Sequence, residues 1–468
     1  MLYSNSLLKY IADGMNNLTK LRSFVITLSQ QGACDLGMYE LYNRLSNCRY
    51  LENLSLGFGK DVINKEHMTA LSQLLRKLIA LKSLFIYLSE LNVEFESMCP
   101  LDFSELDSLD TLWVRVQSVS ISEIDMLRFF WLWTQAKHLT EINLEASNVM
   151  FTSNNSEDVA KLKEKALPPI TTTNQGLKKI RIKLDMCEKS AKFLYKLGKN
   201  FSQWTNLTEL SISIEDKKFI TGGYRALGRD LPYLVRLRSF TLNLPELSEG
   251  PHRNREGCFE IANAIQHFED LEELNISINS SYAWDKTVDT YLFIKGLSLS
   301  FSKTRNLKKL SISAKGNREI CSRSIEAISE GLLCLQGLKE LSLKFNDLNI
   351  KDKDFQLLSK AIGQLKELEI VFIEYKNSAE FTDQSLSNLL LLLQHCHQLK
   401  GGAFFVDGNH VTREGLVEFL ICLSQMKLAS YLFISLTRSK NINSQDLLSI
   451  KKKARDKLFF DKSVRVKI

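Results

Sequence analysis

The residues whose types and spacing come nearest to a metal site are His395, Cys396 and His397. Two imidazoles and a thiolate are ligands that zinc favours. Neighbouring residues at a helix end point in different directions, however, and the sequence offers no complementary pair of ligands. Cys396 lies three residues before a recurring leucine, Leu399, and Cys48 holds the same position in another repeat. We therefore interpret Cys396 as a small core residue.

Other catalytic chemistry finds no support in the sequence. It contains no phosphate-binding Gly-x-x-x-x-Gly-Lys-Ser/Thr loop, no His-Glu-x-x-His helix, no Gly-x-Ser-x-Gly elbow and no kinase signature. Glu272 and Glu273, and likewise Glu326 and Glu330, are neighbouring carboxylates, but they occupy polar positions where solvent contact is expected. We expect a non-enzymatic protein without a cofactor or a metal.

The feature that organises the whole chain is the phrase Leu-x-x-Leu-x-Ile-x-Leu, or a close variant of it. It recurs 14 times at steps of 28 to 38 residues. Its first leucines are Leu21, Leu51, Leu81, Leu109, Leu139, Leu177, Leu207, Leu237, Leu271, Leu307, Leu338, Leu368, Leu399 and Leu428. Such a period is typical of a solenoid, in which each unit packs only on its neighbours. We expect one continuous array over residues 1–450.

Each repeat predicts a strand followed by a helix. In Leu307–Ala314 the alternation places Leu310 and Ile312 on one face, which indicates a half-buried strand. Parallel strands need a crossover, and the segments between them have helical apolar spacing, as in the stripe Leu71, Leu74, Leu75 and Leu78. The predicted helix starts are Thr382, Thr412 and the capping box that begins at Ser120.

These repeats resemble the leucine-rich repeat family, in particular its ribonuclease-inhibitor-like class, which also includes the Ran GTPase-activating proteins. The resemblance covers about residues 1–450. It implies an α/β solenoid, a curved horseshoe of about 14 repeats with parallel strands on the concave face and helices on the convex face. The family's asparagine after the strand occurs only as Asn279 and Asn346. The functional residues of the GTPase-activating proteins have no match in this sequence.

Two stretches depart from the repeat. An irregular insertion is expected at about 148–176, where a polar run and the pair Pro168-Pro169 cannot continue a helix. Residues 451–468 form a basic C-terminal extension with eight Lys or Arg and two Asp, for which we expect a last helix end and a closing strand. The rest of the chain is nearly neutral, since the whole has a formal net charge of +7.

Composition indicates the cellular compartment. The apolar runs are too short to span a bilayer. Nine cysteines without a Cys-x-x-Cys pair fit free thiols in a reducing compartment. We expect an intracellular, eukaryotic and most plausibly cytoplasmic protein.

The residues between the leucines map the face on which recognition is expected. They predict an aromatic patch in the third and fourth repeats, a basic step in the sixth, a polar middle and an aromatic end. The candidate partner-binding residues are Phe85, Tyr87, Trp113, Arg115, Arg181, Lys183, Phe372, Phe405 and Phe433. Aromatic and Arg side chains are the usual anchors of protein interfaces, so we expect protein partners in a larger assembly. The alternative is that these rings fill gaps between repeats. The strand register stays open in the twelfth and fourteenth repeats.

A different class of partner would use the C-terminal extension. Nucleic acid or a ribonucleoprotein could bind there through phosphate contacts. The candidate contacts are Lys451, Lys452, Lys453, Arg455, Lys457, Arg465 and Lys467. A further alternative is a GTPase-activating protein or the substrate-recognition subunit of a ubiquitin ligase.

Overall fold

The computed structural model describes most of the chain. The described residues are 2–28, 35–59, 65–90, 103, 106–122, 126, 136–152, 176–185, 187, 193–194, 197–215, 222–244, 254–279, 288–315, 322–346, 351–376, 380–407, 409–426, 431–437, 441–442, 446 and 464–467. The chain forms two compact units, Met1–Ala226 and Leu227–Ile468. A single continuous array across both units stays a prediction.

In the first unit, parallel strands alternate with the helical side of the repeats. The described helices are α1 (Leu2–Gly14), η1 (Met15–Asn17), α2 (Asp35–Leu45), α3 (Lys65–Lys77) and η3 (Phe201–Gln203). The strands are β1 (Ser23–Leu28), β2 (Asn53–Phe58), β3 (Ser83–Ser89), β4 (Thr111–Gln117), β5 (Ser120–Ser122), β6 (Glu141–Ser147), β7 (Met150–Thr152), β8 (Lys179–Asp185) and β9 (Glu209–Glu215). The main sheet has the order β1-β2-β3-β4-β6-β8-β9.

The second unit repeats this alternation. Its helices are α7 (Gly222–Asp230), which contains the boundary between the units, η4 (Leu231–Tyr233), α8 (Asn254–Ala264), η5 (Ile265–His267), α9 (Val288–Phe301), α10 (Ser322–Leu332), α11 (Asp352–Gly363), α12 (Asp383–His395) and α13 (Arg413–Gln425). Its strands are β10 (Ser239–Leu244), β11 (Glu273–Asn279), β12 (Lys309–Lys315), β13 (Glu340–Asn346), β14 (Ile370–Lys376), β15 (Gly401–Asp407), β16 (Tyr431–Thr437) and β17 (Val464–Lys467). These strands are neighbours in chain order.

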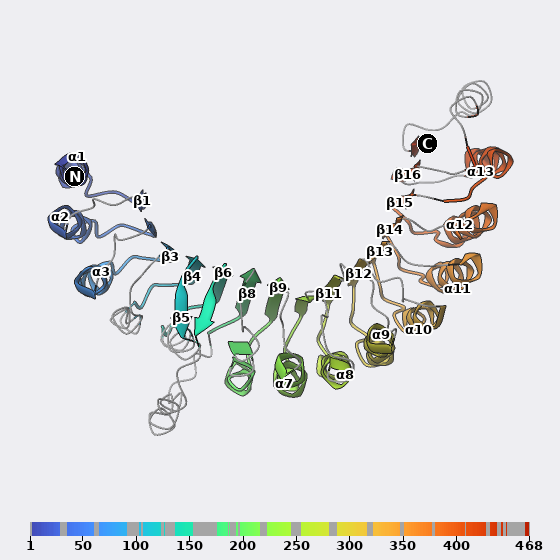
Figure 1. Cartoon of the computed structure of the whole chain (residues 1–468), viewed down its shortest axis with the longest axis horizontal. Coiled ribbons are helices and arrows are strands. Elements are labelled where there is room, and N and C mark those ends of the chain that lie inside the picture. Colours follow the sequence, from blue (N-terminus) through green and yellow to red (C-terminus); the bar gives the residue numbers. More distant parts are fainter. Residues whose placement is uncertain are drawn as a thin grey trace. The chain divides into compact units, whose positions relative to one another are not determined.

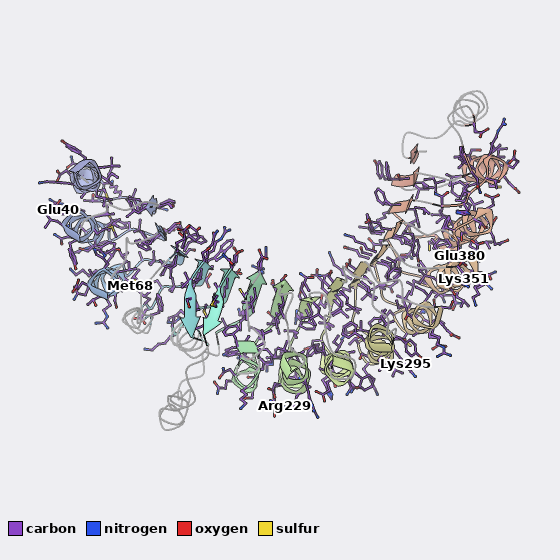
Figure 2. All side chains as sticks on the ribbon, viewed as in Figure 1. Glu40, Met68, Arg229, Lys295, Lys351 and Glu380 are labelled. Atoms are coloured by element: carbon purple, nitrogen blue, oxygen red, sulfur yellow. The ribbon has the colours of Figure 1, made fainter. Side chains whose placement is uncertain are left out.

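The apolar residues of the repeat pack between the sheet and the helices. Leu274, Leu310 and Leu341 stand in register on three neighbouring strands and are buried. On the helical side the stripe Leu71, Leu74, Leu75 and Leu78 is buried as well. Within each unit the strands line one side and the helices the other (Figure 1). Side chains such as Met68 and Lys295 belong to the helical layer (Figure 2). Each unit is therefore a leucine-rich repeat solenoid, as predicted.

Helix caps connect neighbouring repeats in the second unit. Thr382 and Thr412 are the N-caps of α12 and α13, which confirms the prediction from sequence. The Thr382 hydroxyl donates to Asp352 over 2.6 Å, and the Thr412 hydroxyl donates to Asp383 over 2.6 Å. Because each aspartate belongs to the first turn of the preceding helix, the caps also hold neighbouring helices in register.

The capping box predicted at Ser120 is wrong. Residues Ser120–Ser122 form β5, which pairs with β7 in a second, two-stranded parallel sheet. The physical cause lies just before β5, where Ser118 has a φ of 52° and so turns the chain in the left-handed region. Asn148 has the same φ before β7. The part of the predicted insertion at 153–175 lies outside the described residues.

Charged side chains just before the strands form a ladder between repeats. In the first unit Glu52 lies 3.7 Å from Arg22 and 3.2 Å from Lys82. In the second unit Glu369 lies 3.9 Å from Lys339 and 2.6 Å from Lys400. Each carboxylate thus bridges the cations of its two neighbours, which fixes the register at the start of the strands.

Candidate functional site

The candidate site is the face of the strands that points away from the helices. Strand residues alternate between the core and this outward face. In β3 and β4 the burial alternates from residue to residue, and Phe85, Tyr87, Trp113 and Arg115 all lie on the outward face, as predicted. Register places Phe85 beside Trp113 and Tyr87 beside Arg115.

These four residues form one cluster, which we call the N-terminal patch. The rings of Phe85 and Trp113 meet edge to face, with centroids 5.4 Å apart. The guanidinium of Arg115 lies 5.6 Å from the ring centre of Tyr87, which is cation–π geometry. Trp113 remains 41% exposed, so much of its indole surface is available to a partner.

Polar neighbours hold the patch in place. The Tyr87 hydroxyl donates a hydrogen bond of 2.7 Å to the side-chain oxygen of Gln117. The Nε atom of Arg115 lies 3.7 Å from a carboxylate oxygen of Glu145 on β6. The N-terminal patch therefore combines exposed apolar surface with a cation whose position is set by a ring and a carboxylate.

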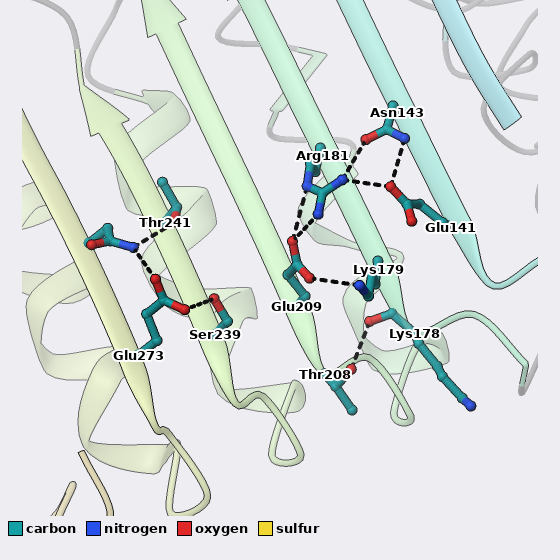
Figure 3. A network of polar contacts seen from close by, with 11 residues as sticks. Glu141, Asn143, Lys178, Lys179, Arg181, Thr208, Glu209, Ser239, Thr241 and Glu273 are labelled. Atoms are coloured by element: carbon teal, nitrogen blue, oxygen red, sulfur yellow. Dashed lines mark hydrogen bonds and ion pairs between the residues drawn. The ribbon is translucent and has the colours of Figure 1, made fainter. Parts of the chain in front are cut away.

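The basic step predicted at Arg181 and Lys183 is only partly basic. Arg181 on β8 lies 2.6 Å from Glu141 and 2.6 Å from Glu209, on the two neighbouring strands (Figure 3). These two carboxylates compensate the guanidinium charge. Lys183 is exposed at the next outward position, and within the described part of the chain no carboxylate lies within ion-pair distance of it.

In the second unit, the three predicted phenylalanines pack into a row, which we call the phenylalanine ribbon. Phe372 on β14 and Phe405 on β15 have ring centroids 5.3 Å apart, and Phe405 and Phe433 on β16 are 5.2 Å apart. Phe372 and Phe433 are both in register with Ala403, two residues before Phe405 on β15, so the three rings form a zigzag across the strands. All three side chains are half-buried on the outward face.

The phenylalanine ribbon depends on the strand register of the twelfth and fourteenth repeats, for which the sequence allowed two alternatives each. In the twelfth repeat Val371, Ile373 and Tyr375 point into the core, so the register that counts from Leu368 is correct. In the fourteenth, the buried residues are Leu432, Ile434 and Leu436, so the register that counts from Ala429 is correct.

Sequence reasoning missed Lys344 at one end of the ribbon. Its ammonium nitrogen lies 5.1 Å from the ring centre of Phe372. Lys344 occupies the second outward position of β13, beside Glu374 in register. Reading both outward positions of every strand would have found it.

The polar middle of the second unit is internally bonded. The side-chain nitrogen of Asn275 donates to Glu273 over 3.0 Å and to Thr241 over 3.4 Å. Ser239 lies 3.5 Å from the same Glu273 carboxylate group. These groups largely satisfy one another, so this stretch offers fewer free donors and acceptors than its composition suggests.

Part of the basic C-terminal extension belongs to the sheet. Residues Val464–Lys467 form β17, parallel to β16, with Arg465 in register with Phe433 and Lys467 with Ser435. The predicted contacts Lys451, Lys452, Lys453, Arg455 and Lys457 lie outside the described residues.

The His395-Cys396-His397 cluster is not arranged as a metal site. Cys396 is buried beside the carbonyl of Ile362, 3.9 Å from its sulfur, and burial raises the pKa of this thiol to about 11. The Nδ1 atom of His395 lies 2.6 Å from the carbonyl oxygen of Leu391 on its own helix. Among the described residues no group of three or more His, Cys, Asp or Glu could hold a metal ion.

Comparison with known proteins adds little to this description. No family model matches the sequence, and neither does a curated protein. Among solved structures, an internalin from Listeria monocytogenes is similar, with 16% sequence identity, coverage of 90% of this chain and 93% of that chain, and a TM-score of 0.44.

No described helix is both long and apolar enough to cross a membrane. By their own strands, helices and register, both units have the leucine-rich repeat fold.

Proposed function

We propose that this protein is a non-catalytic interaction or scaffold protein, and that a protein partner docks on the N-terminal patch. The observation that carries the proposal is Trp113, a large aromatic side chain left 41% exposed on a rigid strand beside Arg115. Buried Trp and Arg residues are the commonest anchors of protein interfaces. Strand-borne side chains also lose little conformational entropy on binding, because the sheet already holds them.

The internal bonds of the patch favour a protein over a small ligand. The rings of Phe85 and Trp113 meet edge to face on the outward strand face, where 41% of Trp113 is exposed. Small molecules need a concave site that buries most of their surface. A partner with a matching apolar hollow and an acidic rim would cover the indole and pair with Arg115.

We place this interaction inside the cell, in a larger assembly in the cytoplasm. The support is that Cys48, Cys187 and Cys396 are free thiols in the core. Buried free thiols are typical of proteins from reducing compartments.

Affinity purification of the intact chain tests the proposal. Trp113→Ala and Arg115→Ala should each remove the same bound protein, with the wild-type melting temperature nearly retained. Tyr50→Ala serves as the control, because Tyr50 is an exposed aromatic residue of the same unit that lies outside the strands. Retention of every partner by both patch variants would show that this patch is not the binding site.

A second candidate function is attachment to nucleic acid or a ribonucleoprotein through the C-terminal extension. The observation that favours it is the backbone register of β17, which pairs the basic residue Arg465 with Phe433 of the phenylalanine ribbon. Phosphate binding and base stacking both use such groups. Binding of single-stranded RNA that falls steeply with salt and is lost on deletion of residues 451–468 would support this function, whereas patch binding should persist.

A further inference from the structure

The strand β1 differs in burial from the strands β2 to β16 of the main sheet, as far as their side chains are described. In the main sheet, to which β5 and β7 do not belong, the core positions of the other strands up to β16 are buried, whereas those of β1, namely Phe24, Ile26 and Leu28, are only half-buried. On the outward face of the same strand Val25 is 69% exposed. In the sheet order of the described residues β1 is the first strand, and β2 is the one described strand that pairs with it.

The backbone of β1 offers hydrogen bonds at this edge. The carbonyls of Arg22 and Leu28 accept bonds from the next repeat, at Asn53 and Gly59. Because successive residues of a strand point their backbone groups to opposite sides, those of Val25 face away from β2. An uncovered row of this kind is a template for pairing with another chain.

The charge at the β1 edge indicates which kind of segment could pair with it. The strand-start ladder alternates in sign through Arg22, Glu52 and Lys82, and Glu52 contacts both cations. Arg22 is the first member of the ladder, and its side chain is 77% exposed. An acidic residue next to Arg22 on its open side would extend the alternation by one step.

We propose that the β1 edge binds an extended segment of a protein partner as an added parallel strand. The segment would carry an acidic residue at the Arg22 level, followed by apolar residues at the levels of Phe24, Ile26 and Leu28. Its pattern is therefore acid-x-apolar-x-apolar-x-apolar. This surface is distinct from the N-terminal patch, so the two proposals stand or fall separately.

The opposite end of the repeats shows that a short strand suffices to continue such a sheet. There β17, only four residues long, pairs in parallel with β16. A second copy of the chain fits the β1 edge less well. Two β1 strands related by a twofold axis would run antiparallel, which would place each Arg22 at the uncharged end near Leu28.

The chain's own repeats provide a probe of the right pattern. A labelled peptide with the sequence of residues 271–279, LEELNISIN, has Glu272 at the level of Arg22 and Leu274, Ile276 and Ile278 at the apolar levels. Its binding to the full chain is measured by fluorescence anisotropy. The control peptide has lysine in place of the first glutamate, and we expect it to bind several-fold more weakly.

Two variants of the chain locate the binding. Val25→Pro removes a backbone N–H on the open side without touching a bond to β2, as proline is tolerated at sheet edges, and it should weaken peptide binding at least tenfold. Arg22→Glu should weaken binding of the glutamate peptide and strengthen binding of the lysine peptide. A folding defect could not produce these opposite changes. Circular dichroism checks that both variants keep the wild-type melting curve.

Two outcomes would overturn the proposal. One is peptide binding that neither variant changes. The other is concentration-dependent self-association of the chain in sedimentation, abolished by Val25→Pro, because the occupant of the edge would then be a second copy. Reversal of the peptide preference by Arg22→Glu, together with loss of binding in Val25→Pro, would establish the edge as the site.

Discussion

The N-terminal patch and the phenylalanine ribbon are both aromatic clusters on outward strand faces, but they are built differently. In the patch the ring of Tyr87 has polar and charged neighbours, Gln117 and Arg115. In the ribbon Phe405 contacts a ring on either side, and the cation of Lys344 lies over the ring of Phe372 at one end. The patch leaves a large ring exposed, whereas the ribbon half-buries its rings in one another.

This difference separates recognition from stability. A ring packed between two others already has much of its contact area inside the molecule, so it gives less to a partner and more to the fold. Among the described residues Trp113 has one ring neighbour, Phe85, and 41% of Trp113 stays exposed for binding. We therefore expect the patch to matter mainly for partners and the ribbon mainly for the stability of its unit.

The largest effect is expected in the core beneath the ribbon. Ile373→Asp inserts a charge among buried apolar residues of β14 and should cost roughly 4 kcal/mol, enough to unfold neighbouring repeats. Phe372→Asp, one residue away on the outward face, is the matched control. Limited proteolysis and urea unfolding measure both variants. Equal losses in the two would contradict the assignment of the faces.

A smaller effect should distinguish the clusters themselves. Phe405→Ala removes two ring contacts and should destabilise its unit by about 2 kcal/mol, because each aromatic pair contributes roughly 0.5 to 1.5 kcal/mol. Trp113→Ala removes one contact from a more exposed ring and should cost about 1 kcal/mol or less. Urea unfolding of the two variants gives the order, and the reverse order would refute the division of roles.

The two clusters could be predicted from the sequence because the repeat determines which residues of each strand face the core. Once the leucines are assigned to the core, the residues between them must face outward, and Phe85 and Trp113 become neighbours. What the sequence concealed depends on contacts between repeats. Glu141 and Glu209 neutralise Arg181 across 40 and 28 residues of chain, which becomes visible only when the repeats are aligned strand by strand.

The error at Ser120 has a different origin. A capping box is a local pattern, and here the left-handed turn at Ser118 directs the chain into a second strand before a helix can begin. No spacing in the sequence announces that turn, because serine adopts positive φ values only rarely.

The polar tether of the patch allows a third test. Tyr87→Phe keeps the ring under Arg115 but removes the hydrogen bond to Gln117, and should destabilise the first unit by about 0.5 to 1 kcal/mol. Gln117→Leu in the same background should add little, because the partner is already lost. A double-mutant cycle measured by urea unfolding checks this, and fully additive losses would mean that the bond contributes nothing.

The smallest expected effect is on the pH dependence of stability. It distinguishes the contribution of the charged ladder from that of ring packing in the repeats that carry the ribbon. The hydrogen bond from Lys400 lowers the pKa of Glu369 below the ordinary 4.5, with the charges of Lys400 and Lys339 acting in the same direction. A carboxyl whose pKa is lower in the folded than in the unfolded chain stabilises the fold above the unfolded pKa. That contribution is lost as the pH falls through the folded pKa.

Unfolding midpoints in urea should therefore decline slightly below about pH 4.5, and Glu369→Gln should remove part of that decline. Because this pair lies at the surface, the effect is small and weakens further with salt. Phe405→Ala is the control, since it lowers stability at every pH without changing the slope. A slope that Phe405→Ala flattened as much as Glu369→Gln does would show that the ladder and the ribbon act as one structural element rather than two.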